Sequence, residues 1–562
     1  MQHITSREAA LVLFERHRKT LDQAVEALEN RGFWTPYPEN PKHYSDQDME
    51  KALARFQQQL HKPFLLKGPE PVGQISCEFS PYGFPLGISY DRYDHDKLLD
   101  RMQQAMPAWR AAGPEARLGV CMEVIQRLNA MSADMSWAVM HTTGQAHMMA
   151  FQAGGPHAQD RGLEALAYAW RHMKSVPSRV NWVKPQGKRA PLQLEKHWFA
   201  VPRGISLLIG CATFPTWNTY PGLFASLATG NPVVIKPHPN AILPLAMTVR
   251  ICQEVLLELG FDPLLVNLLA DTPDAPVAQK VAVDQRVKLI DFTGSSAFGN
   301  WLEENARQAQ VFTEKAGVNT ILLESVRDLD AVARNLAFTL SLYSGQMCTT
   351  PQIIFIPETG IRCGDETISF ERCADALRQA IEALLSDNGR ACAILGAIQS
   401  EATIERIDQC RGTGRVLLDS ETRIHPDFPM ARVRTPLLLQ MKGTSSALYS
   451  EEQFGPISFV VATKSHTDSV RLVSEIVKEK GALTLTLYST DADTIARGET
   501  LAQELAVSIS INFDGAIFPN QSAAFSDFHG SGANPAANAA IVDDSFVSRR
   551  FAWVQSRITV EG

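Results

Sequence analysis

Three side chains in this sequence could together carry out covalent chemistry on a carbonyl group. Cys348 lies in a Ser-Gly-Gln-Met-Cys-Thr-Thr stretch, and its thiolate could attack a carbonyl carbon. Glu314 opens a Glu-Lys-Ala-Gly-Val-Asn stretch further upstream and could act as a general base. Asn218 ends a Phe-Pro-Thr-Trp-Asn segment, and its amide could stabilise an oxyanion. Because a lone cysteine is more often an inert buried thiol, the prediction rests on the three side chains together.

The segments that would position these residues alternate between strand-like and helix-like patterns. The strand-like runs are residues 204–211, 232–236 and 287–292, and the helical runs are residues 220–228 and 298–310. A second unit begins near Asn319, where a helical pattern at 328–344 lies between strand-like runs at 321–323 and 352–357. Such alternation predicts doubly wound parallel sheets, which bind their ligands at the carboxyl ends of the strands.

Residues 1–90 differ in texture from the rest of the chain. Helical patterns at residues 6–30 and 46–59 flank a proline-rich stretch, and residues 73–90 are rich in Gly, Pro and aromatics, which favours extended chain. We predict an extension that packs on the main body; a regulatory or partner-binding arm is the alternative. Helices dominate residues 95–173.

Composition excludes several classes of protein. The net charge is -8, and the pI of about 6.0 leaves no basic surplus for nucleic acid or for anionic lipid. The nine cysteines contain no Cys-x-x-Cys pair, so we expect neither a disulfide framework nor a metal site. The first residues lack the apolar core of a signal peptide, and no apolar run reaches the ~20 residues that span a bilayer. A cytoplasmic location is expected.

Six short motifs, in order along the chain, resemble those of the aldehyde dehydrogenase superfamily. They are Phe-Pro-Thr-Trp-Asn at 214–218, Gly-Asn-Pro-Val-Val-Ile-Lys-Pro at 230–237, Phe-Thr-Gly-Ser at 292–295, Glu-Lys-Ala-Gly at 314–317, Gly-Gln-Met-Cys at 345–348 and Glu-Gln-Phe-Gly-Pro at 452–456. Each motif is weak alone, but six in sequence make chance agreement very improbable.

The resemblance implies a two-step oxidation of an aldehyde to an acid. Cys348 would attack the aldehyde carbon, while Asn218 and the Cys348 backbone N–H hold the oxyanion. Hydride would pass to a nicotinamide and leave a thioester, which water activated by Glu314 would release. Lys236 would reach the adenosine ribose, and Glu452 the nicotinamide ribose. The expected cofactor-binding residues are Trp217, Lys236, Gly294, Ser295, Gly299, Glu452 and Phe454, with the pyrophosphate at the helix that Gly294 and Ser295 begin.

Two departures from the family pattern concern the cofactor and the base. Pro239 stands where many NAD-using members have a Glu that bonds the ribose 2′-hydroxyl, so we hypothesise NADP as the preferred cofactor, with NAD as the alternative. Ala316 replaces the first Gly of the base motif. Lys315 and Glu451, beside site residues, are expected at the surface, and Cys211 in the core. Asn218 has an alternative role as a helix cap.

A narrower similarity concerns residues 83–90, 214–218, 344–350 and 528–534, which look like the PaaN-type proteins of aerobic phenylacetate degradation. It implies a semialdehyde carried on coenzyme A as the substrate. Some relatives fuse a C-terminal hydratase-like domain that opens the ring; this chain ends at Gly562, so ring opening is expected from a separate hydratase.

The resemblance implies an α/β aldehyde dehydrogenase fold with a Rossmann-like cofactor domain, a catalytic domain and a small oligomerisation hairpin. The expected parts are an extension at 1–90, an NAD(P)-binding domain at 91–316, a catalytic domain at 317–515 and a C-terminal return at 516–562. Alternating residues around 180–200 would form the hairpin. Because its open edge needs covering, a homodimer or homotetramer is expected.

Three rival functions remain open from the sequence. An acylating dehydrogenase would pass the thioester to coenzyme A and would need no base, whereas Glu314 favours hydrolysis. A cofactor-free thiol hydrolase could use Cys348, Asn218 and Glu314, but would leave Lys236 and Glu452 without a purpose. A scaffold that keeps the fold would not need the reactive side chains.

Overall fold

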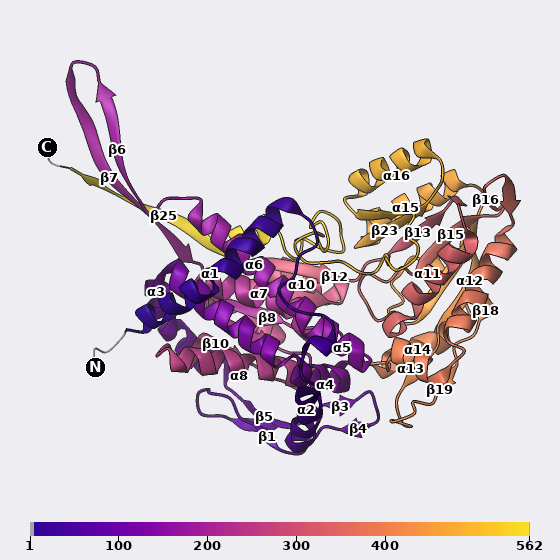
Figure 1. Cartoon of the computed structure of the whole chain (residues 1–562), viewed down its shortest axis with the longest axis horizontal. Helices are drawn as coiled ribbons and strands as arrows, with labels where there is room; N and C mark the ends of the chain where they lie inside the picture. Colours follow the sequence, from indigo (N-terminus) through magenta and orange to yellow (C-terminus); the bar gives the residue numbers. More distant parts are fainter. Residues whose placement is uncertain (1–4, 561–562) are drawn as a thin grey trace.

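The structure is a computed structural model that describes residues 5–560, and it has two α/β lobes side by side (Figure 1). The first four residues of the expected extension and the last two of the expected return lie outside the described residues. Within the described range, no helix is both long and apolar enough to cross a membrane.

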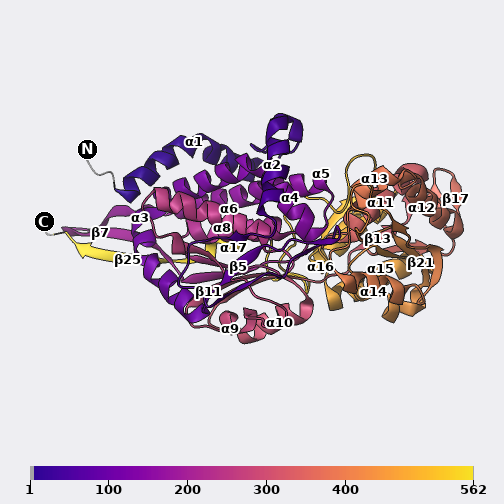
Figure 2. The same ribbon diagram turned by 90° about the horizontal axis from the view of Figure 1, so that it is seen from below.

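The N-terminal segment lies against the helices of the first lobe (Figure 2). Helix α1 (Ser6–Asn30) begins at a capping box between Thr5 and Glu8 and packs against α3 (His95–Ala130) and α6 (Pro156–Lys174). The approach to α3 is close, since a Cβ on Gly119 would lie 2.4 Å from the Ala10 carbonyl oxygen. The other elements of the N-terminal segment are η1 (Pro41–His43), α2 (Asp46–Gln59), β1 (Pro63–Phe64), β2 (Gly73–Ile75), β3 (Phe79–Ser80), β4 (Phe84–Pro85) and β5 (Ser89–Arg92). Two more helices, α4 (Ser132–Thr143) and α5 (His147–Gly154), lie between α3 and α6 in the chain.

A buried carboxylate joins the N-terminal segment to the first lobe. Glu78 accepts hydrogen bonds from the backbone N–H groups of Ile242 and Leu243 at 2.6 and 2.9 Å and from the Tyr90 hydroxyl at 2.5 Å. The two N–H groups belong to the start of α8 (Leu243–Glu258), where a helix leaves its donors unpaired. Burial raises the pKa of Glu78 to about 7 in spite of these donors.

The first lobe is built on a five-stranded parallel sheet in the order β10-β9-β8-β11-β12. Its strands are β8 (Ile205–Ile209), β9 (Val233–Lys236), β10 (Val266–Leu268), β11 (Val287–Gly294) and β12 (Gln310–Lys315), and its other elements are α7 (Pro215–Ala228), η2 (Pro263–Leu265), α9 (Ala278–Ala282) and α10 (Ser296–Asn305). These strands are apolar along their whole length because other segments of the protein cover both faces of the sheet.

One sequence-based expectation in this lobe is wrong. The helix expected at residues 298–310 ends at Asn305, and residues 310–315 form β12, which pairs in parallel with β11. Glu314 therefore lies on a strand. The strand forms because hydrogen bonds to β11 and burial against the sheet outweigh the local preference of a short segment, and neither is visible in the segment itself.

The second lobe contains a seven-stranded sheet in the order β18-β21-β22-β15-β13-β23-β24, in which only the β18–β21 pair is antiparallel. The elements are β13 (Thr320–Leu323), β14 (Ser325–Val326), α11 (Leu329–Ser341), η3 (Leu342–Gly345), β15 (Ile353–Pro357), β16 (Ile361–Cys363), β17 (Glu366–Ile368), α12 (Phe370–Leu384), α13 (Asn388–Leu395), α14 (Glu401–Cys410), β18 (Arg415–Leu418), β19 (Thr422–Arg423), β20 (Val433–Arg434), β21 (Leu437–Lys442), η4 (Gly443–Leu448), β22 (Ile457–Thr463), α15 (His466–Lys480), β23 (Thr484–Tyr488), α16 (Ala492–Leu505) and β24 (Ser508–Ile511). The predicted α/β fold with parallel sheets is confirmed.

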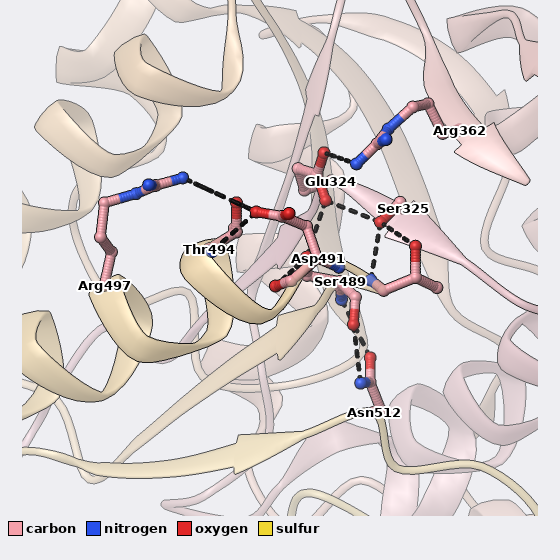
Figure 3. A network of polar contacts seen from close by, with 9 residues as sticks. Glu324, Ser325, Arg362, Ser489, Asp491, Thr494, Arg497 and Asn512 are labelled. Carbon is pink, nitrogen blue, oxygen red and sulfur yellow. Dashed lines mark hydrogen bonds and ion pairs between the residues drawn. The ribbon is translucent and has the colours of Figure 1, made fainter.

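A polar network closes the carboxyl edge of the second sheet (Figure 3). The Glu324 carboxylate, just after β13, accepts hydrogen bonds from the hydroxyls of Ser325 and Ser489 at 2.7 and 2.8 Å. Asn512, just after β24, donates to the Ser489 carbonyl at 2.8 Å. Cys348 precedes β15, so it lies at the opposite, amino edge of this sheet. The network therefore ties strand ends together away from the reactive thiol.

A long hairpin protrudes from the first lobe and carries the C-terminal strand with it (Figure 1). Its strands are β6 (Arg179–Gln186) and β7 (Arg189–Pro202), and β25 (Phe551–Thr559) pairs antiparallel with β7. Val183, Phe199 and Val554 are each about half exposed on this small sheet. An apolar surface of this kind is typical of a contact between subunits.

The C-terminal return is anchored by a buried ion pair. Arg550, which follows α17 (Asp544–Ser548), is fully buried, and its guanidinium donates to both Asp291 carboxylate oxygens at 2.8 and 2.5 Å. It also donates to the Ser226 hydroxyl at 2.9 Å. Asp291 lies on β11, so this one contact fixes the return against an inner strand of the first sheet.

Replacing Asp291 with Ala should destabilise the protein strongly, because the Arg550 charge would stay buried without its partner. Breaking such a pair costs about 3–5 kcal/mol, which a urea or thermal unfolding curve would resolve. Adding Arg550→Met to Asp291→Ala should recover part of the loss. The control Asp22→Ala removes an exposed pair with Arg18 and should change little. An unchanged midpoint for Asp291→Ala would show that the pair does not anchor the return.

Candidate active site

The predicted reactive residues come together where the two lobes meet. Asn218 and Glu314 belong to segments at the carboxyl edge of the five-stranded sheet, after β8 and at the end of β12. Cys348 belongs to the turn at the amino edge of the seven-stranded sheet. The reactive atoms of Glu314, Cys348 and His529 all lie within 4.8 Å of one another. The carboxyl edge of an open α/β sheet is the expected position for a ligand.

The turn that presents Cys348 is held in an unusual backbone conformation. Helix α11 ends at Ser341, three residues earlier than expected, and Tyr343, Ser344 and Gly345 then adopt left-handed φ values of 53, 49 and 63°. Gly345 has no alternative, because a Cβ there would lie 2.4 Å from the Gly455 carbonyl oxygen. The expected end of the helix at residue 344 is corrected, since this tight turn replaces its last residues.

Asn319 fixes the same turn from the neighbouring strand. Its amide donates to the carbonyl oxygens of Cys348 at 2.8 Å and Thr350 at 3.1 Å. Its amide oxygen accepts from the backbone N–H groups of Leu483 and Thr484, both at 2.9 Å. One buried side chain thus connects the cysteine turn to β13 and β23.

Glu314 is a buried carboxylate, 3% exposed, beside the thiol. Within residues 5–560 neither of its oxygens receives a well-aligned hydrogen bond, although His529 Nε2 lies 3.3 Å from Oε2. Burial acts to raise the pKa of Glu314, but the charge of His529 and its contact with the carboxylate outweigh burial and hold the pKa below its ordinary value. Glu314 is therefore ionised at neutral pH and free to accept a proton.

The surroundings of Cys348 disfavour its charged form, whereas those of Glu314 favour the charged form. Its pKa is raised well above the ordinary value, first by burial and then by the negative charge of Glu314. The Sγ atom lies 3.6 Å from Nε2 of His529. A thiolate at this position consequently needs a positive charge or a proton acceptor close by.

Asn218 lies in the first turn of α7, which begins at Pro215, so Phe214 and not Asn218 occupies the cap position. The alternative role of Asn218 as a helix cap is thereby wrong. Its amide donates to the Thr293 hydroxyl at 3.3 Å, and the Cys211 thiol donates to its amide oxygen at 3.5 Å. A small hollow is lined by Asn218, Thr293 and Glu314, among others.

Two residues beside the site do not lie where the sequence analysis expected them. Cys211, expected in the core, is only partly buried and its thiol reaches Asn218. Lys315, expected at the surface, is buried, because it follows Glu314 on β12 and therefore points to the other face of the sheet. There its ammonium donates to Asn300 at 2.8 Å and pairs with Glu303 at 3.1 Å. Glu451 is exposed and pairs with Lys480, as expected.

Lys236, the residue predicted to reach the adenosine ribose, takes part in a buried ion pair. Lys236, the last residue of β9, lies with its ammonium 2.7 Å from an Asp271 carboxylate oxygen. Lys236 and Asp271 are 8% and 2% exposed, so the charge of each is neutralised chiefly by the other.

The predicted pyrophosphate site is the amino end of α10. Gly294 ends β11, and the Ser295 hydroxyl caps the helix by accepting from the Phe298 N–H at 3.4 Å. A Cβ on Gly299 would lie 2.5 Å from Cγ of Lys315, so the helix requires glycine at this point or a displaced Lys315. The helix end offers unpaired N–H groups, and Lys236 is one strand away across β8, so these residues fit a dinucleotide phosphate.

The remaining cofactor candidates lie closer to the thiol. Burial raises the pKa of Glu452 to about 7, although a hydrogen bond from the Gly317 backbone opposes the shift. The Phe454 carbonyl accepts from the Arg406 guanidinium at 2.6 Å. The Trp217 ring packs edge-on against His529 at 4.7 Å, so it borders the reactive cluster.

Sequence reasoning missed His529, Asn319 and Asp271 as members of the site. His529 lies in the 528–534 segment that carried the narrower similarity, but no local pattern links it to Cys348. Asn319 closes the stretch that Glu314 opens. Asp271 follows a short strand, and its carboxylate position at a sheet edge was a usable signal.

Comparisons with known proteins agree with this geometry. The sequence model described as the aldehyde dehydrogenase family matches residues 88–546. A crystal structure of an NAD-dependent aldehyde dehydrogenase from Burkholderia multivorans superimposes with a TM-score of 0.96 at 52% identity, covering 98% of this chain and 99% of that one. A 1-pyrroline-5-carboxylate dehydrogenase from Thermus with bound NAD shares the fold, with a TM-score of 0.73 at 16% identity over 94% of this chain and 99% of that one.

Two characterised aldehyde dehydrogenases match most of this chain in sequence. Vanillin dehydrogenase from Pseudomonas fluorescens is 23% identical over 432 residues, which cover 74% of this chain and 80% of that protein. A salicylaldehyde dehydrogenase from Pseudomonas sp. strain C18 is 21% identical over 77% of this chain and 84% of that protein.

Replacing Asn319 with Ala should lower the reactivity of the Cys348 thiol, because the Asn319 amide holds the backbone of the cysteine turn. The substitution leaves two carbonyls and two N–H groups without their partner, and each buried unpaired group costs about 1–3 kcal/mol. We expect at least about a tenfold loss in the alkylation rate of Cys348 by iodoacetamide, measured by mass spectrometry of its peptide, together with a lower unfolding midpoint. The exposed Asn305→Ala serves as control. Wild-type alkylation in Asn319→Ala would contradict the role.

Proposed function

We propose that the chain, which belongs to the aldehyde dehydrogenase family of NAD(P)-dependent oxidoreductases, releases the acid by hydrolysis of a thioester on Cys348. The observation that carries the proposal is the contact of an ionised, buried carboxylate, Glu314, with the cysteine cluster. An acylating enzyme would have no use for that carboxylate, because its thioester leaves with a thiol.

In the proposed mechanism, Cys348 Sγ forms a bond with the aldehyde carbon. The Asn218 amide and the Cys348 backbone N–H stabilise the oxyanion that results. A bound nicotinamide cofactor would supply the hydride acceptor, so that loss of hydride from the carbon attached to Sγ leaves a thioester on Cys348. Glu314 then takes a proton from a water molecule, whose oxygen attacks the thioester carbon and releases the acid and the thiol. Lys236, the α10 amino end and Glu452 would hold the cofactor, as assigned from the motifs.

We propose that the substrate is a coenzyme A-linked semialdehyde, formed when an oxygenated aromatic ring is opened by a separate hydratase. The similarity to PaaN-type proteins supports this substrate. Relatives named for vanillin and salicylaldehyde act on aldehydes of aromatic compounds.

The ion pair at Lys236 bears on the choice between NAD and NADP. The NADP preference expected from Pro239 assumed that the ribose site lacks a carboxylate. Asp271, in the loop after β10, brings a carboxylate to within 2.7 Å of the Lys236 ammonium. Because a carboxylate repels a 2′-phosphate and already neutralises the lysine, we propose NAD as the preferred cofactor.

We also propose that the protruding sheet of β6, β7 and β25 joins subunits into a homodimer or homotetramer. Its half-exposed apolar side chains support this assembly. The cytoplasmic location stays a prediction.

The proposed substrate is tested by following the absorbance of reduced nicotinamide with purified protein. The panel contains matched aldehydes with and without a coenzyme A handle, each with and without free coenzyme A. Turnover at least about tenfold higher for the coenzyme A-linked semialdehydes, with no requirement for free coenzyme A, is the expected result. Cys348→Ala should abolish it. Turnover only with free aldehydes would remove the proposed substrate, and dependence on free coenzyme A would favour the acylating reaction.

Replacing Asp271 with Asn should narrow the preference for NAD over NADP. The amide keeps the size of the side chain but removes the charge that opposes a 2′-phosphate. We expect kcat/KM with NADP to rise by about tenfold relative to that with NAD. Asp274→Asn, on the same loop and exposed, is the matched control. A wild-type preference for NADP, or an unchanged ratio in Asp271→Asn, would sink the proposal.

A further inference from the structure

His529 completes the reactive cluster from a part of the chain far from both of its partners. Its Nε2 atom lies 3.6 Å from Cys348 Sγ and 3.3 Å from Glu314 Oε2. The side chain is 4% exposed, so bulk water does not separate it from either group. One nitrogen atom is thus shared between the nucleophile and the carboxylate.

The cluster presents an electrostatic problem that Cys348 and Glu314 cannot solve alone. The first step needs a thiolate, and the last needs an ionised carboxylate. Two negative charges within 4.8 Å in a buried site oppose each other strongly. Glu314 could remove the thiol proton itself, but it would then be protonated and could not activate water until that proton had left.

We propose that His529 is a catalytic residue that takes the proton of the Cys348 thiol at Nε2 and holds it between the thiolate and the Glu314 carboxylate. The inference rests on the proposed thioester mechanism and adds the base for its first step. It assigns the two proton transfers to different groups: His529 serves the thiol, and Glu314 serves the water.

The proton balance of this step is simple. In the proposed step His529 starts neutral, with its proton on Nδ1 and the lone pair of Nε2 available to the thiol, and it gains the charge that lowers the pKa of Glu314 when it takes the proton. The S–H bond breaks, the sulfur keeps the electron pair, and a new N–H bond forms at Nε2. The imidazolium then lies between two anions, and its charge offsets the repulsion between them. This proton leaves to solvent before Glu314 accepts a proton from water.

The surroundings hold the imidazole in place. The His529 carbonyl accepts from the Ile541 N–H at 2.9 Å, and the Trp217 ring lies edge-on at 4.7 Å. Other ionisable groups also face the cluster. The Arg161 guanidinium lowers the pKa of Glu314, whereas the negative charges of Cys211 and Glu452 act to raise the pKa of Cys348. The His529 imidazole lies 3.6 Å from the Cys348 sulfur, so it is the group placed to offset a thiolate.

The test measures thiolate formation directly, without substrate or cofactor. The rate of Cys348 alkylation by iodoacetamide is followed from pH 5 to 10 by mass spectrometry of the Cys348 peptide, in wild type, His529→Gln and Glu314→Gln. We expect His529→Gln to move the midpoint upward by about one pH unit or more, which is about a tenfold slower reaction at pH 7. Glu314→Gln should move it downward, because a negative charge is lost. The exposed His61→Gln is the control histidine.

A second variant separates proton transfer from folding. In His529→Ala, added imidazole should restore both the alkylation rate and aldehyde turnover, which a purely structural role would not allow; cofactor binding, read by fluorescence, reports whether the variant is folded. Wild-type pH profiles in His529→Gln, or shifts in the same direction in both Gln variants, would overturn the proposal. Because alkylation needs no aldehyde, a failed substrate assay leaves this test intact.

Discussion

The structure depends on burying a carboxylate beside a thiol. The surroundings favour the charge of Glu314 and oppose that of Cys348: the pKa of the carboxyl is lowered, and the pKa of the thiol is raised by burial and by the carboxylate. Such a pair requires a compensating group, and His529 supplies it from the C-terminal return. The three segments must therefore be held within a fraction of an ångström, which explains the attachments that surround them.

The contacts that hold these segments are buried hydrogen bonds and ion pairs. Asn319 bonds the cysteine turn to two strands, and the left-handed turn at Gly345 leaves no room for a side chain. On the opposite side, Arg550 fixes the return to Asp291 on β11. The return also pairs with the sheet itself, since Glu314 and Ala537 form a β-bridge. The carboxylate and the histidine are thereby positioned by the same segment of chain.

A second buried ion pair lies in the segments predicted to bind the cofactor. Lys236 and Asp271 neutralise each other next to the amino end of α10, where unpaired N–H groups already favour phosphate. The N-terminal segment reaches this region too, because the Cys77 thiol donates to the Pro239 carbonyl and Glu78 caps α8. The segment is therefore a structural part of the first lobe as well as a cover on its helices.

The sequence by itself determined the α/β class and the family, and it predicted Cys348, Glu314 and Asn218 as reactive residues, because short motifs encode turns and reactive groups locally. Only the tertiary structure decided that residues 310–315 form a strand, that Lys315 is buried and that Asp271 meets Lys236. It also brought His529 to a thiol 181 residues away. The physical reason is that strand pairing and charge burial depend on partners distant along the chain, and no local spacing specifies them.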